Sequence, residues 1–354
     1  MNKSKFLIIS YITPIALSFI PVSCNLNENT NENQITVKDM GGREVTINKN
    51  PKNVACISRT TYDLLVAFGL EKNIKGVFKT IKNNSWTKVF DKNIDKRYSL
   101  NYFESAESLL TKNVDLVFSP ENKVSNDLEK SGIKALTCSL YAPKSYEEYV
   151  FYFADLVSKI WDDKEVLRRV NLWKERMTNA INQIKNKLKN HHEAKKTIYY
   201  VRGDRNNGIN YTDNKNSFIE YAYQLLKLDY VGNRFKNNRP SKEEIIKINL
   251  DIISVGGIYQ HTLIEEIKKE TQFKAVKNNQ LFNIPLGLTM FEQLNVFSSA
   301  FLYDQANKIY PNIFNFDVKK EIKELSETFF NINLSNLDIE NILKGLTKDG
   351  KTHI

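Results

Sequence analysis

The spacing of apolar residues predicts one long helix near the middle of the chain. From Asp162 to Asn190, apolar side chains recur in steps of three and four residues, and neither Pro nor Gly interrupts the run. These side chains are Val166, Val170, Trp173, Met177, Ile181, Ile184 and Leu188. Asp162 or Asp163 can cap the start of the helix, and Glu165 is placed to close a capping box on Asp162. Such a helix would be roughly 40 Å long, the width of a small domain.

Short apolar runs alternate with helical segments on both sides of this helix. Strands are predicted at residues 54–58, 74–78, 115–118 and 135–140 before it, and at 197–201, 252–255 and 280–284 after it. Helices are predicted at 62–68, 124–131, 145–160, 218–226, 243–248, 262–270, 297–309, 318–330 and 338–346. A further short helix is predicted to begin at Ala106, and Thr262 is a candidate N-cap for the helix at 262–270. Residues 35–47 are typical of a hairpin around Gly41-Gly42. The pattern predicts an α/β fold of two doubly wound α/β lobes joined by a single long helix. The alternative is an ordinary surface helix inside one large domain.

The first 24 residues have the pattern of a secretion signal. Two lysines precede an apolar stretch at residues 6–20, which is too short and too interrupted by proline for a good membrane-spanning helix. Cys24 follows it as in the lipobox of bacterial lipoproteins, although Pro21 stands where Leu is usual. We therefore expect a signal peptide at residues 1–23 and a lipid on Cys24. A plain signal peptide with a chance cysteine is the alternative.

The predicted domains follow from these patterns. Residues 24–34 combine the lipidated cysteine with a polar, Asn-rich tether that we expect to be disordered. Residues 35–160 form the N-terminal α/β lobe, residues 161–192 the bridging helix and residues 193–354 the C-terminal α/β lobe. The globular body would thus be held at the extracytoplasmic face of the cell membrane. The choice between a periplasm and the surface of a single-membrane cell stays open.

Composition excludes several classes of function. The 354 residues carry a formal net charge of +10, but the lysines are spread singly and no basic block contains interleaved aromatics, so nucleic acid is not an expected partner. Cys56 and Cys138 lie in apolar strand-like runs, which favours buried free thiols, although a disulfide between them stays open. The sequence has no phosphate-gripping glycine loop, no cluster-binding cysteines and no nucleophile elbow, so we do not expect an enzyme. A two-lobed enzyme and a purely structural lipoprotein remain alternatives.

One sequence pattern occurs once on each side of the long helix. In both copies a Glu lies eight residues before an Asp that opens a β-rich run, and two apolar residues stand two and three places after the Glu. The copies run from Glu107 to Asp115 and from Glu243 to Asp251. Equal positions in the two halves predict two lobes of one design.

From Ile35 to its end the chain resembles the substrate-binding proteins of ABC importers for ferric siderophores, haem and vitamin B12. The resemblance is carried by DMGGREVTI, by NVACISRTTYDLLVAFGLEKNIKGV, by the two Glu…Asp segments and by FLYDQANKIYPNIFNFDV. It implies two α/β lobes bridged by one long helix, a monomer without a cofactor of its own, and an ABC permease with its ATPase as partners. Val114 and Leu250 depart from the family, which commonly has Pro before the strand Asp.

The resemblance also implies residues that contact the permease. In the family a Glu on the outer surface of each lobe pairs with arginines of the permease. The matching positions are Glu107 and Glu243, with Glu244 as the competitor in the second lobe. The alternative is that each is only a helix-start Glu favoured by the helix dipole.

Ligands of open α/β sheets bind in loops at the carboxyl ends of strands, so the two lobes would face each other across a cleft. We expect it to be lined by Arg59, Thr60, Trp86, Tyr98, Tyr102 and Tyr141 from the first lobe and by Arg202, Arg205, Tyr211, Tyr259, His261, Met290 and Phe291 from the second. Arginines and aromatic faces suit an anionic chelate, whereas a bare metal ion needs converging His, Asp and Glu. The expected ligand is a ferric siderophore or haem, with Tyr259, Tyr141 and His261 as candidate haem ligands. Cobalamin or a nickel or cobalt chelate is the alternative.

Overall fold

The structure, a computed structural model, describes residues 33–353 of the chain. The predicted signal peptide, Cys24 and most of the predicted tether lie outside the described residues. The described residues belong to one compact unit. No helix in this part of the chain is long and apolar enough to cross a membrane.

A five-stranded parallel sheet forms the centre of the first lobe, with the strand order β5–β4–β3–β6–β7. Its strands are β3 (Val54–Cys56), β4 (Ile74–Phe78), β5 (Tyr98–Leu100), β6 (Leu116–Ser119) and β7 (Ala135–Thr137). The helices of this lobe are α1 (Arg59–Ala67), α2 (Lys79–Lys82), α3 (Thr87–Phe90), α4 (Ala106–Thr111) and α5 (Asn122–Lys130), with 3-10 turns at Glu71–Asn73 and Ile94–Lys96. The predicted hairpin is present as β1 (Gln34–Lys38) paired antiparallel with β2 (Glu44–Asn48). Gly69 follows the end of α1 with a φ of +86°, a left-handed position that glycine adopts readily.

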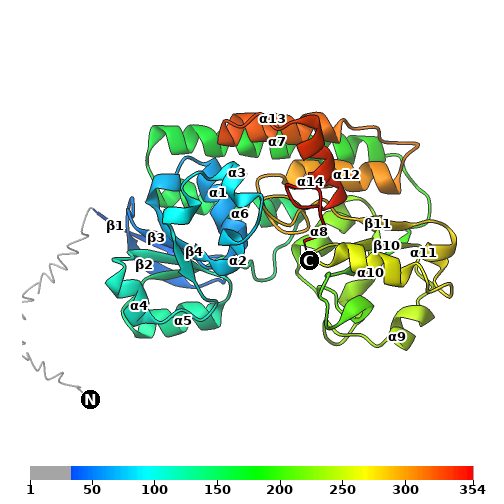
Figure 1. Ribbon diagram of the computed structural model, residues 1–354, viewed down its shortest axis with the longest axis horizontal. Helices are drawn as coiled ribbons and strands as arrows, with labels where there is room; N and C mark the ends of the chain where they lie inside the picture. Colours follow the sequence, from blue (N-terminus) through cyan, green and yellow to red (C-terminus); the bar gives the residue numbers. More distant parts are fainter. Residues whose placement is uncertain (1–32, 354) are drawn as a thin grey trace, which may run out of the picture. The chain divides into compact units, whose positions relative to one another are not determined.

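A four-stranded parallel sheet forms the centre of the second lobe, with the order β11–β10–β8–β9. Its strands are β8 (Thr197–Val201), β9 (Asp229–Tyr230), β10 (Ile252–Val255) and β11 (Leu281–Asn283). The helices are α8 (Phe218–Leu225), α9 (Lys242–Lys247), α10 (Gln260–Ile267), α11 (Lys274–Lys277), α12 (Ser298–Ile309), α13 (Val318–Phe330) and α14 (Asn336–Lys344), with 3-10 turns at Gly208–Asn210 and Val231–Arg234. In each sheet the first strand is central and later strands are added on both sides. The predicted doubly wound α/β fold class is therefore confirmed (Figure 1).

The long helix predicted from the sequence is α7 (Lys164–Leu188), which follows α6 (Tyr146–Ile160) and runs past both lobes in Figure 1. All seven of its predicted apolar positions are buried. Arg169 donates hydrogen bonds to the carbonyl oxygens of Ala67 in the first lobe and Phe329 of α13. Trp173 donates its indole N–H to the carbonyl oxygen of Val296 at 3.1 Å. The helix is thus fixed along its length by polar contacts as well as by apolar packing.

The start of α7 differs in one detail from the prediction. Asp163 is the N-cap, and its carboxylate accepts the backbone N–H groups of Glu165 and Val166 at 2.9 and 3.1 Å. Glu165 does not close a capping box on Asp162, because its carboxylate forms a two-bond ion pair with Arg168. The capping-box prediction is wrong because an arginine one turn along the helix competes for the same carboxylate.

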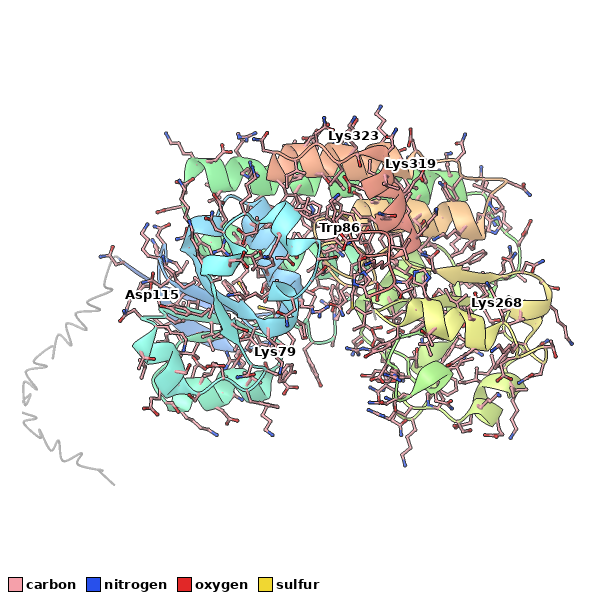
Figure 2. The ribbon with its side chains drawn as sticks, viewed as in Figure 1. Lys79, Trp86, Asp115, Lys268, Lys319 and Lys323 are labelled. Carbon is pink, nitrogen blue, oxygen red and sulfur yellow. The ribbon has the colours of Figure 1, made fainter. Side chains whose placement is uncertain are left out.

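The internal repeat has the same structural role in both lobes. Asp115 precedes β6 and accepts the backbone N–H groups of Lys52 and Asn53, which lead into β3 (Figure 2). Asp251 precedes β10 and accepts the backbone N–H of Thr197, which opens β8. In each copy the Asn two residues before the Asp has a left-handed φ, +51° at residue 113 and +55° at residue 249. The repeated Asp therefore fixes the start of the central strand by accepting the backbone donors of its neighbour.

Several shorter elements were not predicted. Residues 79–102 contain α2, α3 and β5, and the second lobe also contains the short β9 and α11. Thr262 is not an N-cap, since α10 begins at Gln260 and Tyr259 is its N-cap. Elements of two to four residues carry too little periodicity to be recognised from sequence.

The two cysteines of the described chain, Cys56 and Cys138, are free and buried. Burial raises the pKa of both thiols, and that of Cys56 rises to about 12. The interpretation of these residues as buried free thiols agrees with the structure.

Candidate functional site

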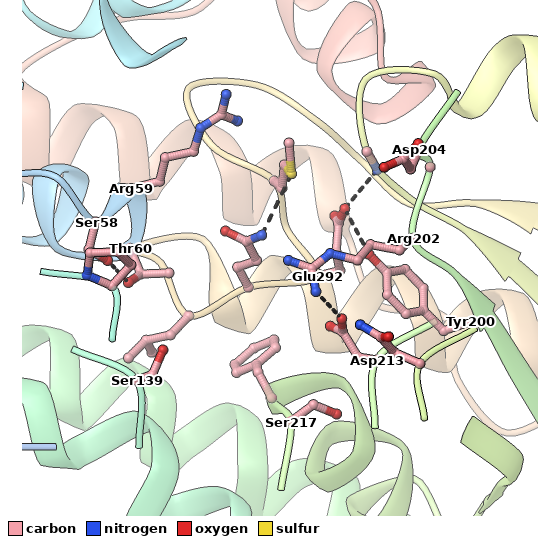
Figure 3. Close-up of a pocket in the computed structure, with 18 of the residues that line it drawn as sticks. Ser58, Arg59, Thr60, Ser139, Tyr200, Arg202, Asp204, Asp213, Ser217 and Glu292 are labelled. Atoms are coloured by element: carbon pink, nitrogen blue, oxygen red, sulfur yellow. Dashed lines mark hydrogen bonds and ion pairs between the residues drawn. The ribbon is translucent and has the colours of Figure 1, made fainter. Parts of the chain in front are cut away.

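A cavity of about 950 Å³ lies where the loops of the two lobes face each other. It is built at the point where each sheet reverses its strand order, which is where open α/β sheets bind ligands. The first lobe supplies residues that follow β3 and β7, and the second supplies residues that follow β8 and β10 together with the segment before α12. Polar side chains from both lobes meet around the cavity in Figure 3.

The wall formed by the first lobe carries one cation, Arg59 at the start of α1. Its Nε donates a hydrogen bond to the hydroxyl of Thr80 at 3.0 Å. No carboxylate in the described residues forms an ion pair with it, and burial lowers the pKa of its guanidinium while Glu292 partly opposes that shift. Ser58 and Thr60 are hydrogen-bonded to each other at 2.9 Å beside it. This wall therefore presents a positive charge that a ligand can pair with.

The wall formed by the second lobe carries a paired arginine. Arg202 Nη1 lies 2.6 Å from Asp213 Oδ1, and its guanidinium stacks over the ring of Tyr211 at 5.2 Å. The backbone N–H of Arg202 also donates to the carbonyl oxygen of Tyr211. Burial raises the pKa of Asp213 although Arg202 acts in the opposite direction. Arg202 is thus largely neutralised by its own partner, whereas Arg205 has no ion-pair partner among residues 33–353 and is exposed at this wall.

Glu292 is the buried carboxyl group of the site, with an exposed fraction of 1%. Its Oε1 accepts the backbone N–H of Gly257 at 2.7 Å and the hydroxyl of Tyr200 at 3.3 Å (Figure 3). Its Oε2 has no hydrogen-bond partner among the described residues. Burial, reinforced by the charge of Asp213, raises the pKa of Glu292 to about 7. The site therefore contains a carboxyl group that changes its charge near neutral pH.

Glycines allow the strand ends of the second lobe to meet at Glu292. Gly203 has a φ of +70°, and a Cβ there would lie 1.8 Å from the carbonyl oxygen of Gly256. A Cβ on Gly256 would lie 2.4 Å from Glu292 Oε1. The loops after β8 and β10 can approach this closely only without side chains.

Eight of the thirteen residues predicted to line the cavity do so. They are Arg59, Thr60, Tyr102, Arg202, Arg205, Tyr211, Tyr259 and Met290. Arginines at strand ends were found because the carboxyl ends of parallel strands share one edge of the sheet.

The other five predicted residues do not line the cavity. Trp86 is fully buried and donates its indole N–H to the carbonyl oxygen of Leu346 at 2.8 Å (Figure 2). Phe291 is fully buried and stacks on Phe297. Tyr98 and Tyr141 are exposed on the first lobe, and the ring of His261 is hydrogen-bonded to the carbonyl oxygen of Gly345. These five side chains lie outside the cavity because a position near a strand end does not determine which way a side chain points, and Tyr98 and His261 belong to β5 and α10 rather than to loops.

The acidic residues of the site carry little recognisable signal in the sequence. Asp213 and Glu292 lie in loops, 11 and 90 residues after Arg202 in the chain, and no spacing links them to it. The only signal at Glu292 is a charged residue inside the apolar stretch from Leu286 to Val296. Within residues 33–353 there is no group of three or more His, Cys, Asp or Glu side chains that could hold a metal ion.

Comparisons with known proteins agree with this architecture. A solute-binding protein from Veillonella parvula aligns with this chain with a TM-score of 0.69 and 20% identity, and the alignment covers 90% of this chain and 99% of the Veillonella protein. The molybdate-binding MolA of Haemophilus influenzae aligns with a TM-score of 0.70 and 14% identity over 85% of this chain and 99% of its own. CeuE of Helicobacter pylori in a Ni–His complex aligns with a TM-score of 0.70 and 19% identity over 88% of this chain and 99% of CeuE. The fold is that of the periplasmic solute-binding proteins.

A sequence relative is also a substrate-binding protein. An uncharacterised ABC transporter substrate-binding lipoprotein of Bacillus subtilis, YvrC, is 21% identical over 297 residues, which are 79% of this chain and 87% of that protein. No protein-family model matches the chain. YvrC and MolA are both components of ABC transporters. The resemblance to substrate-binding proteins inferred from the sequence is confirmed at the level of the fold.

Proposed function

We propose that this protein is an extracytoplasmic solute-binding lipoprotein that captures an anionic metal chelate and delivers it to an ABC permease and its ATPase. The observation that carries the proposal is the inter-lobe cavity with the unpaired guanidinium of Arg59 in its wall. A volume of about 950 Å³ suits a molecule of drug size rather than a bare ion. The absence of a metal-ligand cluster within residues 33–353 also favours a ligand that brings its own chelating groups.

The charges of the cavity favour an anionic ligand less strongly than the sequence suggested. Arg202 is paired with Asp213, so the preference rests on Arg59 and on the exposed Arg205. A ferric siderophore or haem is the proposed ligand class, and Tyr259 is the one candidate haem ligand that lines the cavity. A cobalamin or a nickel or cobalt chelate is the alternative, and a relative of similar fold was solved in a Ni–His complex.

The ligand is tested by isothermal titration calorimetry with ferric siderophores, haem, cobalamin and Ni–histidine. Arg59→Ala should weaken binding of an anionic chelate about 10- to 100-fold, as expected for a hydrogen bond to a charged group. Arg168→Ala is the matched control, since Arg168 lies on the exposed face of α7. Tight binding of cobalamin alone, or an unchanged affinity in Arg59→Ala, would contradict the proposal.

The proposed contacts with the permease are Glu107 and Glu243. Each lies in the first turn of a short helix, α4 or α9, and is exposed without an ion pair among the described residues. The competitor Glu244 is occupied, because it forms a capping box with Ser241. Both helices lie along the lower edge of their lobes in Figure 1, which suits contact with one flat partner.

The proposed anchor is a lipid on Cys24, outside the described residues. Labelled fatty acid should enter the protein in cells and should be lost in Cys24→Ala, which should also be released from membranes. Retention of the label in that variant would contradict a lipid on this cysteine.

A further inference from the structure

A second cavity of about 190 Å³ adjoins the main one. The two share Arg59, Ile258 and Met290 as lining residues, so these three side chains form the partition between them. Figure 3 shows the guanidinium of Arg59 turned away from Ser139 and Ser217, which line the main cavity. We call this second space the side cavity.

Two buried polar atoms of the side cavity lack a hydrogen-bond partner among the described residues. They are the hydroxyl of Thr289, whose side chain belongs to a residue only 4% exposed, and Nε2 of His353. Both residues line the side cavity. Because an unsatisfied buried polar group costs stability, two of them around one cavity indicate that something else completes their hydrogen bonding.

The hydrogen bond on the other side of the His353 ring determines what Nε2 can do. A hydrogen bond to the backbone of Leu346 raises the pKa of His353, and because Nε2 has no partner among the described residues, the ring nitrogen that donates to the carbonyl oxygen of Leu346 is Nδ1. The same oxygen accepts the indole N–H of Trp86 at 2.8 Å, which holds it in place. Burial lowers the pKa of His353, and the neighbouring His261 and Arg59 lower it further. At neutral pH the ring is neutral, and Nε2 presents a lone pair to the cavity.

The groups around the side cavity fit a ligand that carries both hydrogen-bond acceptors and a hydrogen-bond donor. Arg59 and the Thr289 hydroxyl can both donate to an oxygen, whereas His353 Nε2 can only accept. A metal ion is disfavoured because the Arg59 cation lies close enough to His353 to oppose its protonation. A simple carboxylate would satisfy the donors and leave Nε2 unpaired. A carboxylate that carries a hydroxyl or amino group on the adjacent carbon would satisfy all three.

We propose that the side cavity is a subsite for a small carboxylate with an adjacent hydroxyl or amino group, held by Arg59, Thr289 and His353. This inference extends the proposed function, since the group is either a free small acid or an arm of the ligand in the main cavity. Because Arg59 lines both cavities, a ligand bound in one cavity affects how Arg59 can bind a ligand in the other.

The test is titration of the purified protein with glycolate and with acetate, which differ by one hydroxyl group. Binding is followed by calorimetry and by the imidazole NMR signals of His353, assigned from their loss in His353→Ala. Glycolate should bind about tenfold more tightly than acetate, because it adds one hydrogen bond to an otherwise unpaired atom. Glycolate that binds no better than acetate at neutral pH overturns the proposal.

Variants separate a binding role from a structural one. Thr289→Val is nearly isosteric and removes an unpaired hydroxyl, so it should weaken glycolate binding about tenfold while leaving the Tm unchanged or higher. His192→Ala, at an exposed histidine, is the control and should bind glycolate like the wild type. Undiminished glycolate binding in Thr289→Val would overturn the proposal, whatever its Tm.

The two sources of the carboxylate give different results with the chelates of the main cavity. Competition between glycolate and a chelate indicates an arm of the ligand, and simultaneous binding indicates a free acid. Failure of every chelate to bind would contradict the proposed function but would leave the glycolate result intact. Chelate binding without a preference for glycolate over acetate would contradict the side-cavity proposal and would leave the proposed function intact.

Discussion

Glu292 provides a test of how the site is held together, because its pKa of about 7 has a predictable effect on stability. The unfolded chain releases this proton near the ordinary value of 4.5, whereas the folded protein keeps it until about pH 7. Between these values the unfolded state binds fewer protons than the folded state. The free energy of unfolding therefore falls as the pH rises through this window, and the loss is complete above pH 7.

The size of the effect follows from the shift. Each pKa unit corresponds to about 1.4 kcal/mol, so a shift from 4.5 to about 7 corresponds to about 3 kcal/mol of lost stability at high pH. The group is 1% exposed, so solvent screens this interaction little. Gln in its place keeps an oxygen that can accept from Gly257 and Tyr200 but has no proton to release.

We expect Glu292→Gln to be about 1 kcal/mol more stable than the wild type at pH 5 and about 3 kcal/mol more stable at pH 9. Urea unfolding at both pH values measures the difference, and contributions shared by the two proteins cancel. Asp127→Asn, at an exposed aspartate, is the control and should show no such pH-dependent gain.

The same charge should act on the ligand. An anionic chelate should bind the wild type more weakly as the pH rises through about 7, because Glu292 becomes negative in the wall of the cavity. Glu292→Gln should not show this loss. Stability and binding curves that stay parallel for the two proteins from pH 5 to pH 9 would refute the reasoning.

Three further predictions concern the rest of the molecule. Replacing Glu107 and Glu243 together by Lys should abolish uptake in cells and leave ligand affinity unchanged, whereas each single change should have little effect because exposed ion pairs are weak; normal uptake in the double variant would contradict the docking role. Trp173→Phe should lower the free energy of unfolding by about 1–2 kcal/mol, because it leaves the carbonyl oxygen of Val296 unpaired, and an unchanged Tm would argue against that contact. Solution scattering of free and ligand-bound protein should nearly coincide, since one apolar core includes α7 and residues of both lobes, and a large compaction on binding would contradict this.

The architecture was predictable because it rests on periodic patterns. The apolar stripe of α7 and the alternation of strands and helices are local features, and all seven predicted α7 residues are buried in the structure. The Glu…Asp repeat was also visible in the sequence, but only the tertiary structure shows which groups the repeated Asp residues bind. Asp115 and Asp251 accept backbone donors from segments about 60 and 54 residues away in the chain, so only the folded sheet explains their spacing.

Some features of the site could likewise be predicted from the sequence, and others depended on the tertiary structure. The sequence by itself determined that the loops after the parallel strands carry arginines, because strand ends are recognisable and share one edge of a sheet. Only the tertiary structure decided that Arg202 is neutralised by Asp213, that Glu292 is buried with a shifted pKa, and that Trp86 belongs to the core. Charge, burial and the direction of a loop side chain depend on neighbours that are distant in sequence, and no local pattern records them.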